Sequence, residues 1–129
     1  MTAALPDLAR ELLDRQSFVV LTTINPDGGP QSTVVWAKYD GDELVFSTIR
    51  GRRKTRNMER DPRVSVCAYD PTDPYRYFEV RGTVTMTEDG GDALIQELSQ
   101  AYDDKPFVEE RAGSVRVVCR VRATKVTLR

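Results

Sequence analysis

Residues 46–57 read Phe-Ser-Thr-Ile-Arg-Gly-Arg-Arg-Lys-Thr-Arg-Asn, a segment that runs from apolar residues through one glycine into a basic run. Its first part is typical of a strand end, and residues 52–60 have a helix-forming composition, with Thr55 and Met58 spaced to face inward. A strand that turns into a helix start leaves backbone N–H groups free beside cationic side chains, which favours a bound phosphate. We therefore expect an anion site here; a solvated basic helix is the alternative interpretation.

Short strands are expected on both sides of this stretch. Apolar and β-branched runs bounded by Asn, Asp, Gly and Pro indicate strands over residues 17–24, 31–39, 43–48, 63–69 and 114–128. A further strand follows the turn at residues 70–74, because Phe78, Val80, Val84 and Met86 alternate with polar residues. Tight turns join the first three strands, which predicts an antiparallel meander.

Three short helices are expected between the strands. The first carries Leu5, Leu8, Leu12 and Leu13 at helical spacing, with Pro6 in its first turn. The second covers residues 52–60, and the third begins at an N-cap on Thr87. The sequence has no regular strand–helix–strand alternation, so a doubly wound parallel sheet is excluded. It predicts one mainly β (α+β) domain over residues 1–129, with six antiparallel strands in a barrel or sandwich and short peripheral helices.

The composition excludes several classes of function. A net charge of -1 does not supply the broad basic face of a nucleic-acid-binding protein, and no apolar run is long enough to span a membrane. Histidine is absent, which removes the commonest acid–base group and histidine-based metal sites, so we expect no metal and assign no catalytic side chain. Isolated cysteines at positions 67 and 119 indicate a reducing, cytoplasmic location. Any redox chemistry is expected to come from a cofactor.

The motif Lys54-Thr55-Arg56-Asn57, followed by Asp61-Pro62-Arg63, resembles a known family. It is similar to the split β-barrels of the pyridoxamine 5'-phosphate oxidase-like class, and more narrowly to the branch that uses the deazaflavin coenzyme F420 in place of FMN. The resemblance implies a six-stranded split β-barrel that forms a homodimer around the cofactor. It also implies hydride transfer from the reduced deazaflavin to a small electron-poor acceptor.

The resemblance also implies a set of cofactor-binding residues. The phosphate is expected on Arg53 and Lys54 with the strand-end residues Ser47 and Thr48, and Arg56 and Asn57 complete the motif. The ring is expected along Thr33, Val34, Val35 and Trp36, and Tyr77 falls where a partner subunit reaches the ring. The sequence stops at Arg129, without the substrate-binding tail of the pyridoxamine phosphate oxidases, so we expect a different activity.

Alternatives remain open for several of these residues. Trp36 could be a core or interface anchor, Tyr77 and the nearby Tyr75 could be exposed cross-strand residues, and Arg56 and Asn57 could be ordinary helix surface. An FMN-binding oxidoreductase or a non-catalytic cofactor-binding module would use the same fold. A surplus of arginines, at positions 50, 52, 56 and 60, favours the longer anionic tail of the deazaflavin over FMN.

Overall fold

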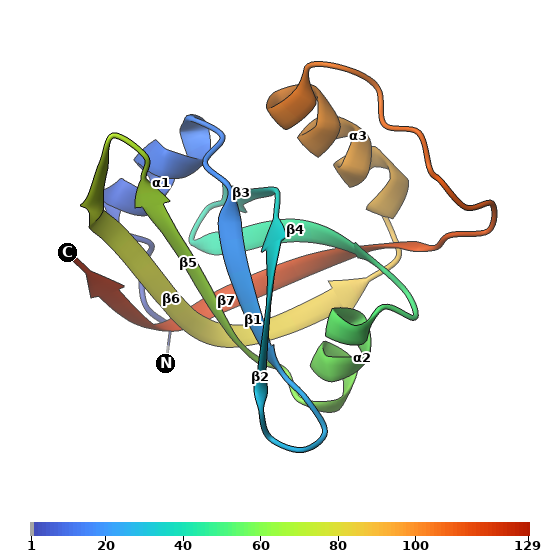
Figure 1. The fold of residues 1–129 in the computed structure, drawn as a ribbon, viewed down its shortest axis with the longest axis horizontal. Helices are drawn as coiled ribbons and strands as arrows, with labels where there is room; N and C mark the ends of the chain where they lie inside the picture. The colour runs from blue at the N-terminus through green and yellow to red at the C-terminus, as the bar shows by residue number, and fades with distance from the viewer. Residues whose placement is uncertain (1) are drawn as a thin grey trace.

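A single antiparallel sheet, strongly curled, organises the protein in a computed structural model that describes residues 2–129 (Figure 1). Its strands are β1 (Val19–Ile24), β2 (Pro30–Val35), β3 (Ala37–Asp40), β4 (Glu43–Ile49), β5 (Arg63–Asp70), β6 (Asp73–Thr87) and β7 (Arg116–Leu128). They lie in the order β2-β1-β5-β6-β7-β4-β3. The expected β class with peripheral helices is confirmed, and the sheet forms a half-barrel.

The sheet has seven strands, and the prediction of six was wrong. The expected strand at residues 31–39 is divided at Trp36, so that β2 pairs with β1 whereas β3 pairs with β4. These two pieces lie at opposite edges of the sheet, which rules out the predicted meander. Val35 and Ala37 flank the break and are both buried, so the alternation of buried positions continues through it. A pattern of period two therefore gives no sign of the division.

Three helices cover the ends of the sheet: α1 (Asp7–Asp14), α2 (Arg53–Arg60) and α3 (Gly91–Asp103). Thr55 and Met58 of α2 are buried, as the sequence predicts. The predicted start of α3 at Thr87 was wrong, because the helix is preceded by Gly90, which has a φ of 84°. A Cβ atom on Gly91 would meet the carbonyl oxygen of Arg116, so the helix begins where the backbones pack too closely for a side chain.

The core fills the concave side of the curled sheet. Phe46, Leu21 and Phe78 are among its fully buried side chains, and the predicted inward face of β6 is confirmed by the burial of Phe78, Val80 and Val84. Helix α1 adds Leu12 to this core. Among residues 2–129 no helix is long and apolar enough to cross a membrane, and no cluster of potential metal ligands is present.

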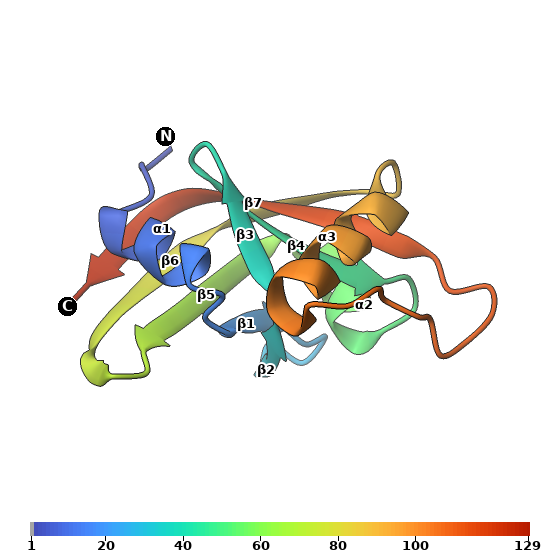
Figure 2. The ribbon, with the colours of Figure 1, turned by 90° about the horizontal axis from the view of Figure 1, so that it is seen from above.

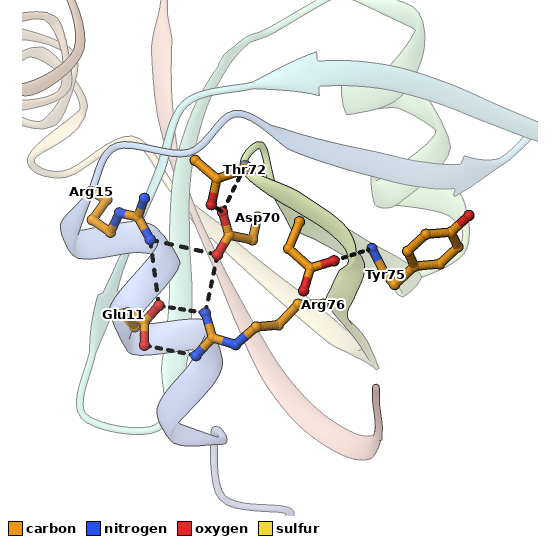
Figure 3. Close-up of polar contacts among 7 residues, drawn as sticks. Glu11, Arg15, Asp70, Thr72, Tyr75 and Arg76 are labelled. Carbon is orange, nitrogen blue, oxygen red and sulfur yellow. Dashed lines mark hydrogen bonds and ion pairs between the residues drawn. The ribbon is translucent and has the colours of Figure 1, made fainter.

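Ion pairs fasten α1 to the hairpin between β5 and β6 (Figure 3). The guanidinium group of Arg76 contacts both carboxylate oxygens of Glu11 at 2.6 and 2.9 Å, and it contacts Asp70 at 3.1 Å. Asp70 is nearly fully buried and also accepts hydrogen bonds from the backbone and hydroxyl of Thr72. Ion pairs and hydrogen bonds therefore hold α1 against one end of the sheet, and α2 lies at the opposite end (Figures 1 and 2).

Candidate functional site

A groove of about 750 Å³ lies between two parts of the chain. One part comprises β2, β4 and the start of α2, and the other is the segment that follows α3. The views in Figures 1 and 2 place α2 and the α3–β7 segment at the same end of the molecule. The lining residues come from the residue before β1, from β2 and the break after it, from β4 and the turn into α2, from α2 and α3, and from the segment between α3 and β7 with the first residue of β7. They are Phe18, Val34, Val35, Trp36, Ser47, Ile49, Arg50, Gly51, Arg52, Lys54, Ile95, Leu98, Phe107, Val108, Glu109, Glu110, Arg111, Ser114 and Arg116. The groove thus combines a basic end with an apolar end.

The basic end is built by the turn into α2. Gly51 has a φ of 94°, a conformation that side-chain-bearing residues rarely adopt, and this turn places Arg52 and Lys54 at the groove. Lys54 is half-buried, and none of the carboxylates in residues 2–129 pairs with it. Burial, with the positive charges of Arg52 and Arg116, lowers the pKa of the Lys54 ammonium. An anionic ligand here would relieve this repulsion.

Arg116, at the start of β7, is a second buried cation in the groove, with only 8% of its surface exposed. Its guanidinium donates a hydrogen bond to Ser47 Oγ at 3.3 Å and forms an ion pair with Glu109 through both carboxylate oxygens. The same group lies 4.6 Å from the ring centre of Phe107. Arg116 is not among the predicted site residues. In the sequence it alternates with Val115 and Val117, which is typical of a residue on the solvent side of a strand, whereas α3 and the following segment cover that face.

The apolar end is formed by Trp36 and its neighbours. The Trp36 ring stacks on Tyr102 at 5.6 Å with an interplanar angle of 17°. The hydroxyl of Tyr102 accepts a hydrogen bond from the backbone N–H of Ala37 and lies within hydrogen-bond distance of two carbonyl oxygens. These contacts fix the strand break, while Val34 is 63% exposed at the groove. The result is a flat apolar surface beside a basic pocket, a combination that suits a planar ring with an anionic tail.

The structure brings together some of the predicted site residues. Val34, Val35, Trp36, Ser47 and Lys54 all line the groove. The neighbouring Thr33 does not line it, but its hydroxyl oxygen is buried without a hydrogen-bond partner among residues 2–129.

The other predicted site residues lie elsewhere. Thr48 is buried behind the groove, where its hydroxyl is 2.9 Å from that of Thr55. Asn57 is also fully buried and donates hydrogen bonds from its amide to Thr23 and Asn25. Arg53 and Arg56 are exposed on α2 outside the groove lining. Tyr77 is half-buried on β6, opposite Tyr69 of β5 and away from the groove of its own chain.

The arginine surplus is smaller than the sequence suggests. Arg50 forms ion pairs with Glu59 at 3.2 Å and Glu88 at 3.1 Å. Arg60 donates hydrogen bonds to the carbonyl oxygen of Ile24 and to Asn57. Because these cations are engaged within the chain, the arginines of this segment that remain available to a ligand are those at positions 52, 53 and 56.

Comparison with known proteins identifies the family. Residues 5–129 match the family model described as "Pyridoxamine 5'-phosphate oxidase". The chain belongs to this family. A pyridoxine/pyridoxamine 5'-phosphate oxidase from Rubrobacter xylanophilus is 36% identical over 85 residues, which are 65% of this chain and 36% of that protein. The chain therefore spans little more than a third of this curated relative.

Solved structures within the pyridoxamine 5'-phosphate oxidase-like fold show the same architecture. An F420 reductase superposes with a TM-score of 0.82 at 38% sequence identity, covering 92% of this chain and 94% of that one. A pyridoxamine 5'-phosphate oxidase-related, FMN-binding protein from Nostoc punctiforme superposes with a TM-score of 0.71 at 19% identity, covering 93% and 80% of the two chains. The second likeness concerns the fold alone. The chain thus has the flavin-binding oxidoreductase fold of its family.

Proposed function

We propose that the protein is a coenzyme F420-dependent oxidoreductase. The observation that carries this proposal is the unpaired, half-buried Lys54 at one end of a groove whose other end is apolar and aromatic. The likeness to the F420 reductase, at 38% identity over nearly the whole chain, supports the deazaflavin over FMN. The exposed arginines at positions 53 and 56 lie on the same helix as Lys54 and are free to meet an extended anionic tail.

The residues of the groove fit a cofactor of this kind. Lys54 and Ser47 would hold the phosphate, and Val34, Val35 and Trp36 would pack against the ring. When bound, the reduced deazaflavin supplies a hydride to a small electron-poor organic acceptor. The protein positions the two molecules and excludes water from the ring face, which requires no acid–base side chain.

Indirect roles in cofactor binding are proposed for Arg53, Thr48 and Asn57. The side chains of Thr48 and Asn57 are buried in hydrogen bonds within the protein, so they support the walls of the groove from behind. Arg53 would act on the cofactor through its charge at the rim. Tyr75 and Tyr77 carry hydroxyl groups that could donate a proton, but neither lines the groove of its own chain, so within one chain the proton would come from water.

A homodimer belongs to the same proposal. On the outer face of the sheet Val20 lies between Val34 and Cys67 in adjacent strands, and Phe18 and Tyr69 are 60% and 55% exposed nearby. An apolar strip of this kind on an uncovered sheet face is suited to two-fold pairing. Pairing would also give Tyr77 a place beside the groove of a second chain, as the family resemblance implies. The reduced thiols of Cys67 and Cys119 suit a cytoplasmic setting.

Titration of the purified protein with coenzyme F420 and with FMN tests the proposal. We expect the deazaflavin to bind more tightly and its reduced form to be oxidised when a panel of enones, quinones and tetrapyrroles is added. Tighter binding of FMN, together with turnover of reduced FMN, would reassign the function to an FMN-dependent oxidoreductase. Binding of the deazaflavin without turnover of any acceptor would favour a non-catalytic binding module.

A further inference from the structure

Glu109 is a carboxylate that lies among cationic side chains at the basic end of the groove. The basic end of the groove is formed by Arg52, Lys54 and Arg116, and Glu109 is the carboxylate that pairs with one of them. It belongs to the segment between α3 and β7, at residues 104–115, whose Phe107 lies against the same guanidinium. This segment therefore supplies both the counter-charge and the aromatic cover of Arg116.

The need for a counter-charge follows from the burial of Arg116. A guanidinium that is 8% exposed and unpaired is strongly unfavourable, because its lost hydration must be replaced by other acceptors. Ser47 provides a single hydroxyl oxygen at 3.3 Å, which does not neutralise the charge. Glu109 completes the shell with two oxygens, using the bidentate geometry that guanidinium groups form with carboxylates and with phosphates alike.

We propose that Arg116 is an anion-binding residue of the groove and that Glu109 occupies its ligand position in the free protein. A phosphoryl group entering the groove would replace Glu109 on Arg116, while Ser47 keeps the guanidinium in place. This inference deepens the proposed function, because it rests on the same groove holding a phosphorylated cofactor. Glu109 thereby weakens phosphate binding, and residues 104–115 are released from Arg116 when the ligand binds.

The exchange replaces one anionic partner of Arg116, the carboxylate of Glu109, with another, the phosphoryl group of the ligand. The pair of Arg116 with Glu109 carries no net charge, and a phosphodiester on Arg116 would give the same balance. A phosphomonoester carries about −1.5 to −2 at neutral pH, so it would bring a further negative charge to the groove. The displaced carboxylate moves toward solvent, since Glu109 is itself 30% exposed and its neighbour Glu110 is exposed. Lys54 lies at the same groove and has no carboxylate of its own, so it would share the incoming oxyanion with Arg116.

The test compares Glu109→Gln with Asp103→Asn, which removes one negative charge from an exposed residue at the end of α3, outside the groove lining and outside any ion pair in residues 2–129. Each protein is titrated with FMN and with riboflavin, which carries the same ring without the phosphate. Loss of the competing carboxylate should tighten FMN binding by about tenfold, the effect of one charge-assisted contact. Riboflavin binding, and FMN binding to the control variant, should change by less than about twofold. Unchanged or weaker FMN binding by Glu109→Gln would overturn the inference.

Hydrogen–deuterium exchange gives a second readout that does not depend on affinity. Residues 104–115 of the free parent should exchange slowly relative to Glu109→Gln, and saturating FMN should raise the parent's exchange toward that of the variant. Equal exchange in the free parent and the free variant would contradict the proposed ion-pair lock. Binding of FMN but not of coenzyme F420 would refute the proposed function and leave this inference standing. Turnover with F420, combined with no effect of Glu109→Gln on FMN affinity or on hydrogen exchange, would refute this inference and leave the proposed function standing.

Discussion

The amide nitrogen of Asn57 lies 3.0 Å from the hydroxyl oxygen of Thr23, and both side chains are fully buried. The same amide reaches Asn25 at 3.1 Å, so one side chain of α2 fastens the helix to the end of β1 and the turn that follows. The helix that carries Lys54 is therefore positioned by a hydrogen-bonded residue of its own motif.

Replacing Asn57 with alanine is expected to destabilise the protein. Thr23 Oγ1 would lose the hydrogen bond that the Asn57 amide donates to it inside the core, which costs about 1–3 kcal/mol for a buried polar group. Urea unfolding at neutral pH measures the loss, and Arg56→Ala, an exposed neighbour, serves as the control with little expected change. If Asn57→Ala keeps full stability but loses cofactor affinity, the residue contacts the cofactor directly, as the family resemblance implies.

A second prediction concerns Lys54. Lys54→Ala should weaken cofactor binding by about ten- to a hundredfold, the effect of one charge-assisted hydrogen bond, without unfolding the protein. Arg53→Ala, which removes an exposed charge beside it, should have a smaller effect. Fluorescence titration measures both variants. Equal losses in the two would show that general charge, and not a groove contact, holds the phosphate.

The pH dependence of binding follows from the environment of Lys54. Its pKa is lowered in the free protein by burial and by Arg52, so the ammonium loses its proton at lower pH than an exposed lysine. A phosphate favours the protonated form, so affinity is highest below this pKa and falls as the pH rises through it. The fall should be absent in Lys54→Arg, because arginine stays protonated throughout. A parent whose affinity is flat across the alkaline range would contradict a Lys54 contact.

The sequence predicts the fold best where a single local pattern decides the structure. Alternation along β6 correctly placed Phe78 and Val80 in the core, and the composition of residues 52–60 correctly predicted α2. The break at Trp36 was not predictable, because the buried positions Val35 and Ala37 keep their parity while their pairing partners change. The pairing partner of a strand that is distant in the sequence cannot be predicted from the local residue pattern.

The position of a candidate site residue at the groove was predictable only where chemistry and exposure agree. Lys54 follows from a basic helix start after a strand and Ser47 from the family resemblance, and both line the groove. Asn57 is polar yet fully buried, whereas the sequence analysis offered it as a cofactor-binding residue or as helix surface. Arg116 is charged yet covered by a distant segment, and it was not among the predicted site residues. Burial of a polar residue depends on which part of the chain lies over it, and that is a property of the tertiary fold.

The ion pairs of α1 should make stability sensitive to acid. Arg76 lowers the pKa of Glu11, and hydrogen bonds from Thr72, together with Arg76, lower that of Asp70. Carboxyls with lowered pKa values stabilise the fold above their ordinary pKa, and this contribution is lost as the pH falls through the lower folded value. Melting temperatures between about pH 6 and pH 2 should therefore fall less steeply in Glu11→Gln than in the parent. A variant with Glu110→Gln, which removes an exposed charge outside any ion pair in residues 2–129, should follow the parent; identical slopes in all three proteins would contradict the argument.

The exposed apolar strip leads to a prediction about assembly. We expect a dimeric mass by light scattering at micromolar protein concentration, because Phe18, Val20 and Tyr69 expose apolar surface on one sheet face. Tyr69→Lys should shift the protein toward monomer by placing a charge on that face. Ala93→Lys, on the exposed side of α3, should leave the mass unchanged. A monomeric parent, or a dimer unaffected by Tyr69→Lys, would place the interface elsewhere or remove it.

The salt dependence of binding should separate the two candidate cofactors. FMN ends in one phosphate, whereas the deazaflavin carries a phosphodiester and a chain of glutamates that extends beyond the groove. Arg53 and Arg56 are exposed and have no ion-pair partner among residues 2–129, so they are available to that chain, and each such contact is screened by salt. We expect F420 affinity to fall more steeply than FMN affinity between low and high salt. The difference between the F420 and FMN salt dependences should disappear in the double variant Arg53→Ala/Arg56→Ala. It should also disappear when the glutamate chain of the cofactor has been trimmed. Equal slopes for both cofactors in the parent would show that these arginines do not meet the tail, and the preference for the deazaflavin would then rest on the groove alone.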